Sequence, residues 1–559
     1  MLISRKSAFL LSLPIVIGTC LGTVWAGDAL AADDAASPAP EGFPPAVCAA
    51  PPPPAAPLTK PSVNAQSYRP FPASWQKILD GLVGEGRVPG AVVIVKSPAW
   101  GVRVGTAGVA DLASKAKISP DMQFRVGSVS KLFLALTVLQ LEQEGRLRLT
   151  DPVLKHLGDN ALVAGIPHIG DVTVGDLLQM KSGIANYLGA PAIGFSPQVT
   201  PDRHFDPEDL VKVLSTAGGE KPLPPDFVPK QTYPNPYWVS VFQGQPPSPA
   251  PAPYPFWYYS NSNYTLLGMI AEKVSGLKAE QVMQRYVMDR AGLPDTYLAT
   301  DNKTLPHIHG YTKWGPIPYP HQVYNDWCDV TAVNPSYAWT AGGVVSTPWD
   351  LLKLGDAVFK SNTLLNQGTK EKWYTFVSSD LHIGWEVSEY GVGGLMQPHR
   401  AYGTARGHGG AFPGYKTLLY YFFDADTFFV LATNTWDQGW EVAMLDGIMP
   451  LVASAATTPR PKAGATGVKV GGDGTVDVSW QAGRVYGSSY TVFWGADAGK
   501  VDAATGLAHE GVQMAAVTDT KARLTAGRGQ TLYWKVDTLA PDQATPVVSG
   551  PLWSFKTAK

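Results

Sequence analysis

The sequence is short of charge and of cysteine. Only 16% of its 559 residues are Asp, Glu, Lys or Arg, and 44 basic residues nearly balance 46 acidic ones. Because a nucleic-acid-binding surface needs a clustered basic excess, this balance argues against a nucleic-acid partner. Three cysteines are too few for a disulfide framework or a cysteine-based metal site. The motifs G-x-S-x-G and H-E-x-x-H are absent, which argues against an α/β-hydrolase and a zincin metalloprotease.

The first residues have the order of a secretory signal peptide. Arg5 and Lys6 precede an apolar run over residues 8–25, and Ala29–Ala31 places small residues at a cleavage site. We expect residues 1–31 to be removed and the mature protein to be periplasmic or secreted. An uncleaved membrane anchor is the alternative interpretation of so long an apolar run.

A segment rich in Pro and Ala follows. Residues 32–72, which include Pro51–Pro54, have no periodic apolar pattern and predict an extended linker. Cys48 lies in this linker and Cys328 far downstream. An oxidising compartment permits a disulfide between them, and two free thiols are equally compatible with the sequence.

Residues 73–456 predict an α+β domain. Strands are expected at Ala91–Lys96, Val102–Val109, Tyr415–Phe423 and Thr427–Thr433. Between them, helices are expected at Leu132–Glu144, Val174–Met180, Pro207–Leu214, Tyr264–Val274, Ala279–Arg290 and Trp349–Phe359. Because strands open and close the segment, we expect one antiparallel sheet flanked by helices, beside an all-helical region.

Residues 465–559 predict a separate all-β sandwich. Apolar and polar residues alternate in Val476–Trp480, Tyr490–Trp494 and Leu532–Val536, with turn residues between these stretches. The segment resembles a fibronectin type III module. Such a module is a candidate for contact with cell-wall or surface material.

The first candidate for chemistry is Ser-x-x-Lys, which occurs four times. Its serines are Ser74, Ser114, Ser128 and Ser275. Only Ser128 opens an apolar helix, where a spacing of three places Lys131 on the same face. A buried lysine loses solvation of its charged form, so it can take the proton of a serine and activate it. The alternative is a helix-capping serine beside a solvated lysine, and capping is the role we expect for Ser74.

A second group lies at Tyr259-Ser260-Asn261, directly before a predicted helix. A cation beside a tyrosine favours phenolate, so a neighbouring Lys131 would lower the pKa of Tyr259. The amide of Asn261 can orient both the lysine and a substrate. An ordinary buried tyrosine before a helix is the alternative.

A third group, His408-Gly409-Gly410, leads into the predicted terminal strand pair. Glycines there would let a substrate backbone approach the strand closely, and His408 could polarise a substrate group. His-x-Gly occurs elsewhere in the chain, so the triplet alone predicts nothing. A strand-end histidine without a chemical role is the alternative.

Together the three groups resemble the serine β-lactamase and penicillin-binding-protein superfamily, in particular its class C β-lactamase and D-alanyl-D-alanine carboxypeptidase branch. The residues that carry the resemblance are Phe124–Lys131, Tyr259–Asn261 and His408–Gly410, with supporting matches at Val88–Ala91, Leu177–Gly183 and Ala341–Thr347. It covers about residues 75–450 of the chain.

The resemblance implies an acyl-enzyme mechanism without a metal or a cofactor. It implies Ser128 as the nucleophile and Lys131 with Tyr259 as the proton-transfer pair. Asn261 would position the substrate. The backbone N–H groups of Ser128 and Ala411 would form an oxyanion hole.

The expected activity is cleavage of a D-amino-acid peptide bond, as in the peptide stems of peptidoglycan. His408 stands where many β-lactamases have lysine, and an aromatic, Pro-rich insert at 219–256 directly precedes the Tyr259 group. Both features argue against β-lactam hydrolysis as the main activity. An esterase or amidase for small molecules is one alternative. A non-catalytic peptidoglycan- or β-lactam-binding protein, acylated without turnover, is the other.

Overall fold

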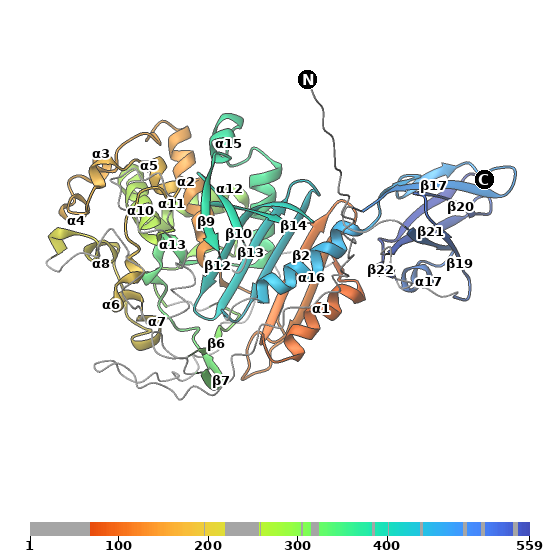
Figure 1. Ribbon diagram of the computed structural model, residues 1–559, viewed down its shortest axis with the longest axis horizontal. Coiled ribbons are helices and arrows are strands. Elements are labelled where there is room, and N and C mark those ends of the chain that lie inside the picture. Colours follow the sequence, from red (N-terminus) through yellow and green to blue (C-terminus); the bar gives the residue numbers. More distant parts are fainter. Residues whose placement is uncertain are drawn as a thin grey trace, which may run out of the picture.

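A computed structural model describes residues 68–559, except 195, 219–256, 258, 303–305, 315–322, 383–385, 401, 437–439, 484–488, 505–508 and 540–545. The expected signal peptide, most of the expected linker and the insert lie outside the described residues. Figure 1 shows a large domain of sheet and helices, with a smaller β-rich module at the C-terminal end. Among the described residues, none of the helices has the length and apolarity that a membrane span requires.

A nine-stranded sheet organises the larger domain. In spatial order its strands are β1 (Arg69–Pro70), β3 (Gly101–Gly108), β2 (Gly90–Ser97), β14 (Thr427–Thr433), β13 (Tyr415–Phe422), β12 (Gly403–Phe412), β11 (Leu395–Arg400), β10 (Glu386–Gly391) and β9 (Phe376–His382). Neighbouring strands are antiparallel except β1, which runs parallel to β3. The pairing of β2 with β14 confirms that the first and last predicted strands share one sheet.

Helices cover both faces of this sheet. They include α1 (Ala73–Gly84), α14 (Pro348–Gly355) and α16 (Trp440–Ser454). Successive side chains of β13 point to opposite faces. On one face the Lys416 ammonium lies 2.8 Å from the carboxylate of Glu441 in α16, and both side chains are buried. On the other face Leu419 lies against Gly355 at the end of α14. The predicted arrangement of a sheet flanked by helices is therefore confirmed.

The helical region is built around one buried helix. α2 (Ser130–Gln143) is buried from Ser130 to Leu141, and a helix that is buried on all sides belongs to a core. The helices around it are α5 (Val174–Leu178), α8 (Pro207–Lys212), α10 (Asn261–Ser275) and α11 (Ala279–Met283). α10 and α11 pack against α2, and α5 and α8 pack against α10. Figure 1 shows this helical region beside the end of the sheet that carries β9, β10 and β12.

The C-terminal module has two small sheets and its own apolar core, which includes Trp480 and Trp534. Its strands are β15 (Thr457–Arg460), β16 (Ala465–Val468), β17 (Thr475–Gln481), β18 (Ser489–Gly495), β19 (Val512–Val517), β20 (Lys521–Thr525), β21 (Thr531–Leu539), β22 (Pro546–Val548) and β23 (Trp553–Thr557). A separate strand-rich unit is therefore confirmed, but it is not all-β, because it also contains the short helix α17 (Ala498–Ala503). Because β15 already pairs with β17, its strands begin at Thr457 rather than at the expected residue 465.

Two local expectations near the start of the domain are wrong. The expected linker ends before residue 72, because β1 pairs with β3 and the side chain of Phe71 is buried against Gly105. Ser74 does not cap α1, since the capping position is Pro72. The helix begins at Ala73, before Ser74, because the fixed φ of Pro72 is compatible with the N-terminal end of a helix.

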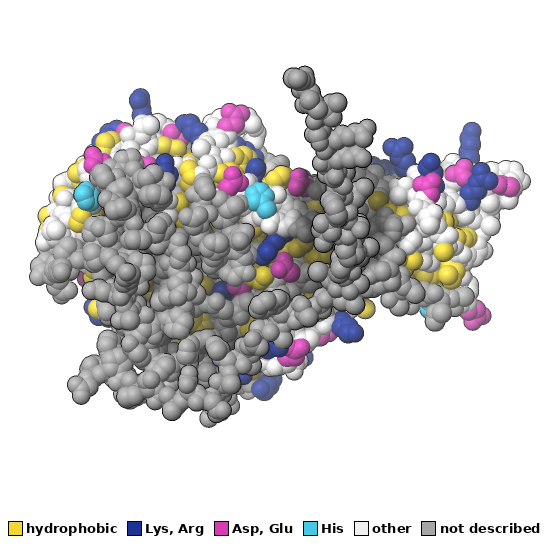
Figure 2. Space-filling model, in the orientation of Figure 1, with side chains coloured by type: hydrophobic (Ala, Val, Ile, Leu, Met, Phe, Trp, Pro, Cys, Tyr) yellow, Lys and Arg dark blue, Asp and Glu magenta, His cyan; other side chains and the backbone are white. Residues whose placement is uncertain are grey.

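Cys328 lies on β7 (Val323–Asp329) and is disulfide-bonded. Cys48, the partner that the sequence left open, lies outside the described residues. On the face drawn in Figure 2, basic and acidic side chains lie in small mixed groups, as the balanced composition predicts.

Candidate active site

Ser128 lies in a tight turn, η2 (Gly127–Val129), directly before α2. Gly127 has a φ of +54°, a left-handed conformation that favours glycine. The hydroxyl of Ser130 holds the turn: it donates to the Gly127 carbonyl at 2.7 Å and accepts from the Val344 N–H at 3.0 Å. Ser128 itself is only partly buried. Its hydroxyl is therefore fixed in place and still accessible.

The side-chain nitrogen of Lys131 lies 3.0 Å from Oγ of Ser128. Its other hydrogen-bond partners are Oδ1 of Asn261 at 2.7 Å and the carbonyl oxygen of Ala341 at 2.8 Å. Both of these oxygens only accept, so a neutral amine that donates to them turns its lone pair toward the serine. The side chain is fully buried, and burial holds the pKa of Lys131 well below its ordinary value. This arrangement suits a base for Ser128.

The hydroxyl of Tyr259 makes a hydrogen bond with the Ser128 side chain. Burial raises the pKa of Tyr259, and the contact with Ser128 only partly opposes this effect. The expectation that Lys131 lowers this pKa is therefore wrong. The lysine nitrogen lies over the face of the ring, 4.9 Å from its centre, and burial disfavours the lysine's charged form as well. A phenol that keeps its proton is suited to donate it.

Asn261 begins α10 and touches Lys131 as the sequence predicts. Its amide nitrogen donates to Oδ1 of Asn186 at 3.4 Å, which leaves its oxygen for the lysine. The hydroxyl of Ser262 donates to the Ala185 carbonyl at 2.6 Å. These contacts tie the start of α10 to the preceding loop and fix the amide beside the lysine.

β12 brings Gly410 and Ala411 against the Ser128 turn. A Cβ atom added to Gly410 would lie 1.9 Å from the carbonyl oxygen of Val126 and 3.1 Å from the nitrogen of Ser128. A Cβ atom on Gly127 would lie 2.6 Å from the nitrogen of Ala411. The two backbones are therefore in direct contact. The backbone N–H groups of Ser128 and Ala411 therefore lie close together, as the two donors of an oxyanion hole must.

One edge of β12 is open beside this turn. β11 pairs with β12 only between Gly403 and Gly407. Beyond that point β13 borders one side of His408–Phe412, and no described strand borders the other. Gly409 is partly exposed there. An extended peptide could add to this edge through backbone hydrogen bonds.

His408 is fully buried, and its ring contacts other protein groups. Nδ1 contacts the carbonyl of Gly409, so this nitrogen carries the proton, and Nε2 lies 3.4 Å from the hydroxyl of Tyr390. Burial, with a smaller contribution from the charge of Lys131, lowers the pKa of His408 to about 3. The ring is therefore neutral at neutral pH. Its action on a substrate stays a prediction, since the ring is buried.

Two groups at the site were not identified from the sequence. The Ala341 carbonyl lies in a stretch that supports the family resemblance, but a backbone acceptor has no sequence signal of its own. Tyr390 lies on β10, whose strand character the sequence did not predict. Its ring centre lies 5.3 Å from that of Trp257 and 6.3 Å from that of Tyr259. Trp257 is itself buried. These rings form an aromatic cluster behind Ser128.

The other Ser-x-x-Lys serines have structural partners. The hydroxyl of Ser114 donates to Asp111 at 2.5 Å, and that of Ser275 contacts the Glu272 carbonyl at 3.4 Å. No hydrogen bond joins these serines to their lysines in the part of the chain that the structure describes. Within the same residues, no group of His, Cys, Asp or Glu side chains could hold a metal ion.

Known proteins resemble this chain in sequence and in fold. A family model described as Beta-lactamase matches residues 75–453. A penicillin-binding protein of Bacillus subtilis (strain 168) is 26% identical over 351 residues, covering 60% of this chain and 66% of that protein. The D-stereospecific amidohydrolase of Streptomyces sp. is 26% identical with a TM-score of 0.52, covering 67% of this chain and 98% of that chain. The D-amino acid amidase of Ochrobactrum anthropi SV3 shares the fold, with 21% identity, a TM-score of 0.54, and coverage of 68% and 98%.

The chain spans 66% of the length of the Bacillus relative, slightly less than two thirds. The family model, however, covers well over half of this chain and includes Ser128, Lys131, Tyr259 and His408. The chain therefore belongs to the β-lactamase family of serine hydrolases.

Proposed function

We propose that the protein is an exported hydrolase that cleaves an amide bond beside a D-amino acid, with peptidoglycan peptide stems as its substrate class. The observation that carries the proposal is the accessible hydroxyl of Ser128, 3.0 Å from the buried nitrogen of Lys131. The Streptomyces relative is named as a D-stereospecific amidohydrolase, which supports the D configuration. The open edge of β12 suits a peptide better than a small ester, because it offers backbone hydrogen bonds along its length.

In the proposed reaction, Oγ of Ser128 attacks the substrate carbonyl carbon as its proton passes to the neutral amine of Lys131. The N–H groups of Ser128 and Ala411 stabilise the resulting oxyanion. The C–N bond then breaks, and the phenol of Tyr259 gives its proton to the leaving amine. The phenol regains a proton from Lys131. Water attacks the acyl-serine by the reverse path and releases the acid.

A fluorescent penicillin tests the nucleophile. We expect the wild-type chain to be labelled covalently and Ser128→Ala to give no label, because acylation needs that hydroxyl. Ser275→Ala is the matched control and should label normally, since its hydroxyl faces a backbone carbonyl. Labelling of Ser128→Ala at the wild-type rate would contradict the assignment. Label that persists for hours would favour a binding protein without turnover.

The substrate class needs a separate assay. We expect release of the C-terminal residue from a peptide ending in D-Ala-D-Ala, and at least a hundredfold lower kcat/KM for the L-Ala-L-Ala isomer. Activity on a small acetyl ester with none on the D-peptide would favour the esterase alternative. Export is part of the proposal, and N-terminal sequencing of the mature chain tests whether residues 1–31 are removed.

A further inference from the structure

Trp339 has a backbone conformation that bulky residues avoid. Its φ is +35°, in the left-handed region, where the Cβ atom of an L-residue crowds the following carbonyl oxygen. The residue begins the short helix α13 (Trp339–Gly342), and its side chain is buried. Strained residues cluster at functional sites, where the surrounding structure enforces the conformation. The contacts of α13 show what this conformation achieves.

Five other non-glycine residues have a positive φ in the part of the chain that the structure describes. They are Lys115, His168, Met180, Asp426 and Thr458. Of these five, all but Met180 are at least partly exposed, in turns or on a short strand. Trp339 therefore differs from most of them in being both bulky and enclosed, which is the combination that needs support from its neighbours.

The helix α13 carries a carbonyl group that orients the lysine of the active site. Ala341, two residues after Trp339, accepts a hydrogen bond from the Lys131 amine at 2.8 Å. A Cβ atom on Gly342 would lie 3.8 Å from the carbonyl carbon of Gly127, so α13 also lies against the Ser128 turn. The direction of the Ala341 carbonyl depends on the backbone dihedrals just before it.

Contacts with α10 hold this strained turn in place. A Cβ atom on Gly268 would lie 2.8 Å from Cζ3 of the Trp339 ring and 2.6 Å from Oγ1 of Thr340. The two helices approach so closely only because residue 268 has no side chain. The Thr340 hydroxyl donates to the Tyr264 carbonyl at 2.8 Å, and the Gly343 N–H donates to the Trp339 carbonyl at 2.6 Å. The turn is thereby fixed between α10 and the Ser128 turn.

We propose that Trp339 is a positioning residue for Lys131: its ring packs on α10, holds its own backbone at a positive φ and so aims the Ala341 carbonyl at the amine. A neutral amine has two N–H donors, and its lone pair faces Ser128 only when both donors are held. Asn261 holds one of them and Ala341 the other. The inference rests on the proposed role of the lysine as base. Absence of wild-type acylation would overturn both proposals, whereas normal wild-type acylation leaves the variants to test this one alone.

Two substitutions separate the backbone conformation from the ring. Trp339→Ala and Trp339→Gly remove the same ring, but only glycine adopts a positive φ without strain. We expect Trp339→Gly to be acylated by a fluorescent penicillin roughly tenfold faster than Trp339→Ala, and the wild type to be fastest. Rates are compared per folded molecule, with the folded fraction measured by circular dichroism. A lost packing contact alone would favour alanine, the better helix former, so an equal or slower rate for Trp339→Gly overturns the proposal.

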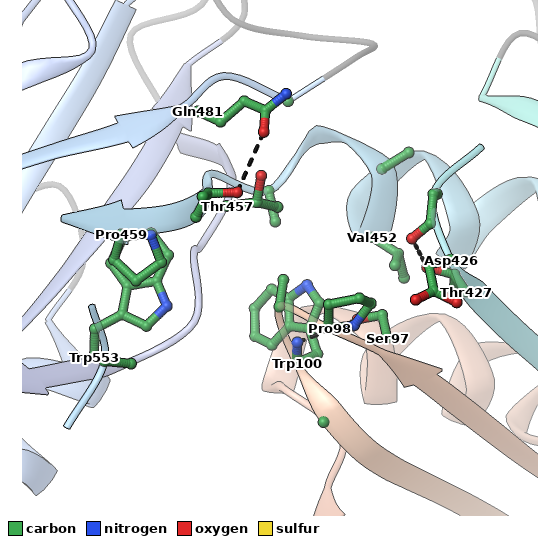
Figure 3. Close-up of a pocket in the computed structure, with 18 of the residues that line it drawn as sticks. Ser97, Pro98, Trp100, Asp426, Thr427, Val452, Thr457, Pro459, Gln481 and Trp553 are labelled. Carbon is green, nitrogen blue, oxygen red and sulfur yellow. Dashed lines mark hydrogen bonds between the residues drawn. The ribbon is translucent and has the colours of Figure 1, made fainter. Parts of the chain in front are cut away.

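Thr458 supplies the matched control for strain. Its φ is +52°, and it lines the hollow between the catalytic domain and the C-terminal module that Figure 3 draws. Ser128 and Lys131 are not among the residues that line this hollow. Thr458→Ala and Thr458→Gly should both be acylated at the wild-type rate. A tenfold difference between these two as well would overturn the proposal, since strain anywhere in the chain would then alter the rate.

Gly268→Ala tests the same contact from α10. Its methyl group displaces Trp339 and Thr340, and with them the Ala341 carbonyl, so acylation should slow roughly tenfold or more. Gly81→Ala is the control, because a Cβ atom at this position of α1 meets nothing within 4 Å. It should be acylated at the wild-type rate. Equal rates for the two variants would overturn the proposal.

The pH profile of Gly268→Ala distinguishes misplacement from loosening. The groups that titrate beside the Lys131 amine are His408 and the rings of Tyr259 and Tyr264, whose centres lie 4.9 and 5.6 Å from it. Burial keeps all three neutral, because it raises the pKa of both tyrosines and lowers that of His408 to about 3. The acid limb of acylation therefore reports the lysine. Loss of a neutral acceptor should lower the plateau and leave this limb nearly in place. Loosening that admits water would solvate the charged amine and move the limb to higher pH, which would overturn the proposal.

Discussion

The side-chain nitrogen of Lys131 lies 2.7 Å from Oδ1 of Asn261, which follows it by 130 positions in the chain. The partner is a neutral amide, so it orients the lysine without supplying a negative charge. Burial therefore keeps the pKa of Lys131 low. A carboxylate at the same place would orient the lysine equally well but would favour its protonated, inactive form.

We therefore expect Asn261→Asp to raise the pKa of Lys131, because a neighbouring negative charge favours the charged form of the lysine. A base must be unprotonated to act, so acylation by a fluorescent penicillin should slow strongly at pH 7 and recover as pH rises. The acid limb of the pH–rate profile should move to higher pH. Asn261→Ala is the control, because it removes the orienting contact without adding charge. Its rate should fall with little movement of the profile, and an unmoved profile in Asn261→Asp would contradict the role of Lys131 as base.

The contact between β12 and the Ser128 turn gives a second prediction. Gly410→Ala places a methyl group 1.9 Å from the carbonyl oxygen of Val126, and backbone cannot yield as a side chain can. The strand must move, and the oxyanion hole should lose its geometry. We expect a fall in acylation rate of about 10²–10³-fold, as when one oxyanion donor is lost.

Gly409→Ala is the matched substitution one residue earlier. Its methyl group would lie 3.4 Å from the Leu418 side chain and 3.8 Å from the Thr417 carbonyl oxygen and the Tyr420 hydroxyl, which are all ordinary contacts. We expect a much smaller loss of acylation rate than for Gly410→Ala. If both variants lost acylation rate equally, any side chain on this part of β12 would slow acylation. The close contact of Gly410 with the Ser128 turn would then not be the cause.

Much of this fold follows from local sequence signals. Short stretches rich in apolar, β-branched and aromatic residues predict β2, β3, β13 and β14, and the apolar run after Ser128 predicts α2. The spacing of Ser128 and Lys131 predicts their contact, because residues three apart share one helix face. Strands β9, β10 and β11 were not predicted, since their pairing depends on neighbours that the fold supplies rather than on a periodic pattern.

The electrostatics of the site could not be predicted from residue types alone. The sequence places Lys131 and Tyr259 in one site but gives neither their burial nor the angle between lysine and ring. Burial reverses the expected shift of the tyrosine pKa. The burial of His408 could not be predicted either, because it depends on contacts such as that with Tyr390, which lies on a different strand.

His408 should make stability depend on pH. Burial lowers its pKa from 6.5 to about 3 in the folded state, so the unfolded chain binds the proton more readily. Stability is therefore fully present above pH 6.5 and is lost as pH falls toward 3. Between pH 6.5 and pH 5 the wild type should lose up to about 2 kcal/mol more unfolding free energy than His408→Asn. Urea unfolding at both pH values measures this, and identical losses would show that the imidazole is not held neutral.

The final prediction separates packing from substrate contact at Trp257. Its ring is buried beside Tyr259 and Tyr390, at centre distances of 6.1 Å and 5.3 Å, so we expect a packing role. Trp257→Ala should destabilise the domain by about 3–5 kcal/mol. It should lower kcat/KM alike for a D-peptide with a bulky side chain and for a small acetyl ester, because Tyr259 loses its support.

Trp257→Phe decides between the two roles. The indole nitrogen of Trp257 is buried and has no hydrogen-bond partner among the described residues. Phenylalanine keeps most of the ring packing and removes only this N–H, so a packing role predicts a melting temperature and both kcat/KM values close to wild type. A selective loss for the D-peptide at an unchanged melting temperature would instead show that the indole N–H binds that substrate. Both variants need measuring side by side, since only the pair distinguishes a lost contact from a loosened Tyr259.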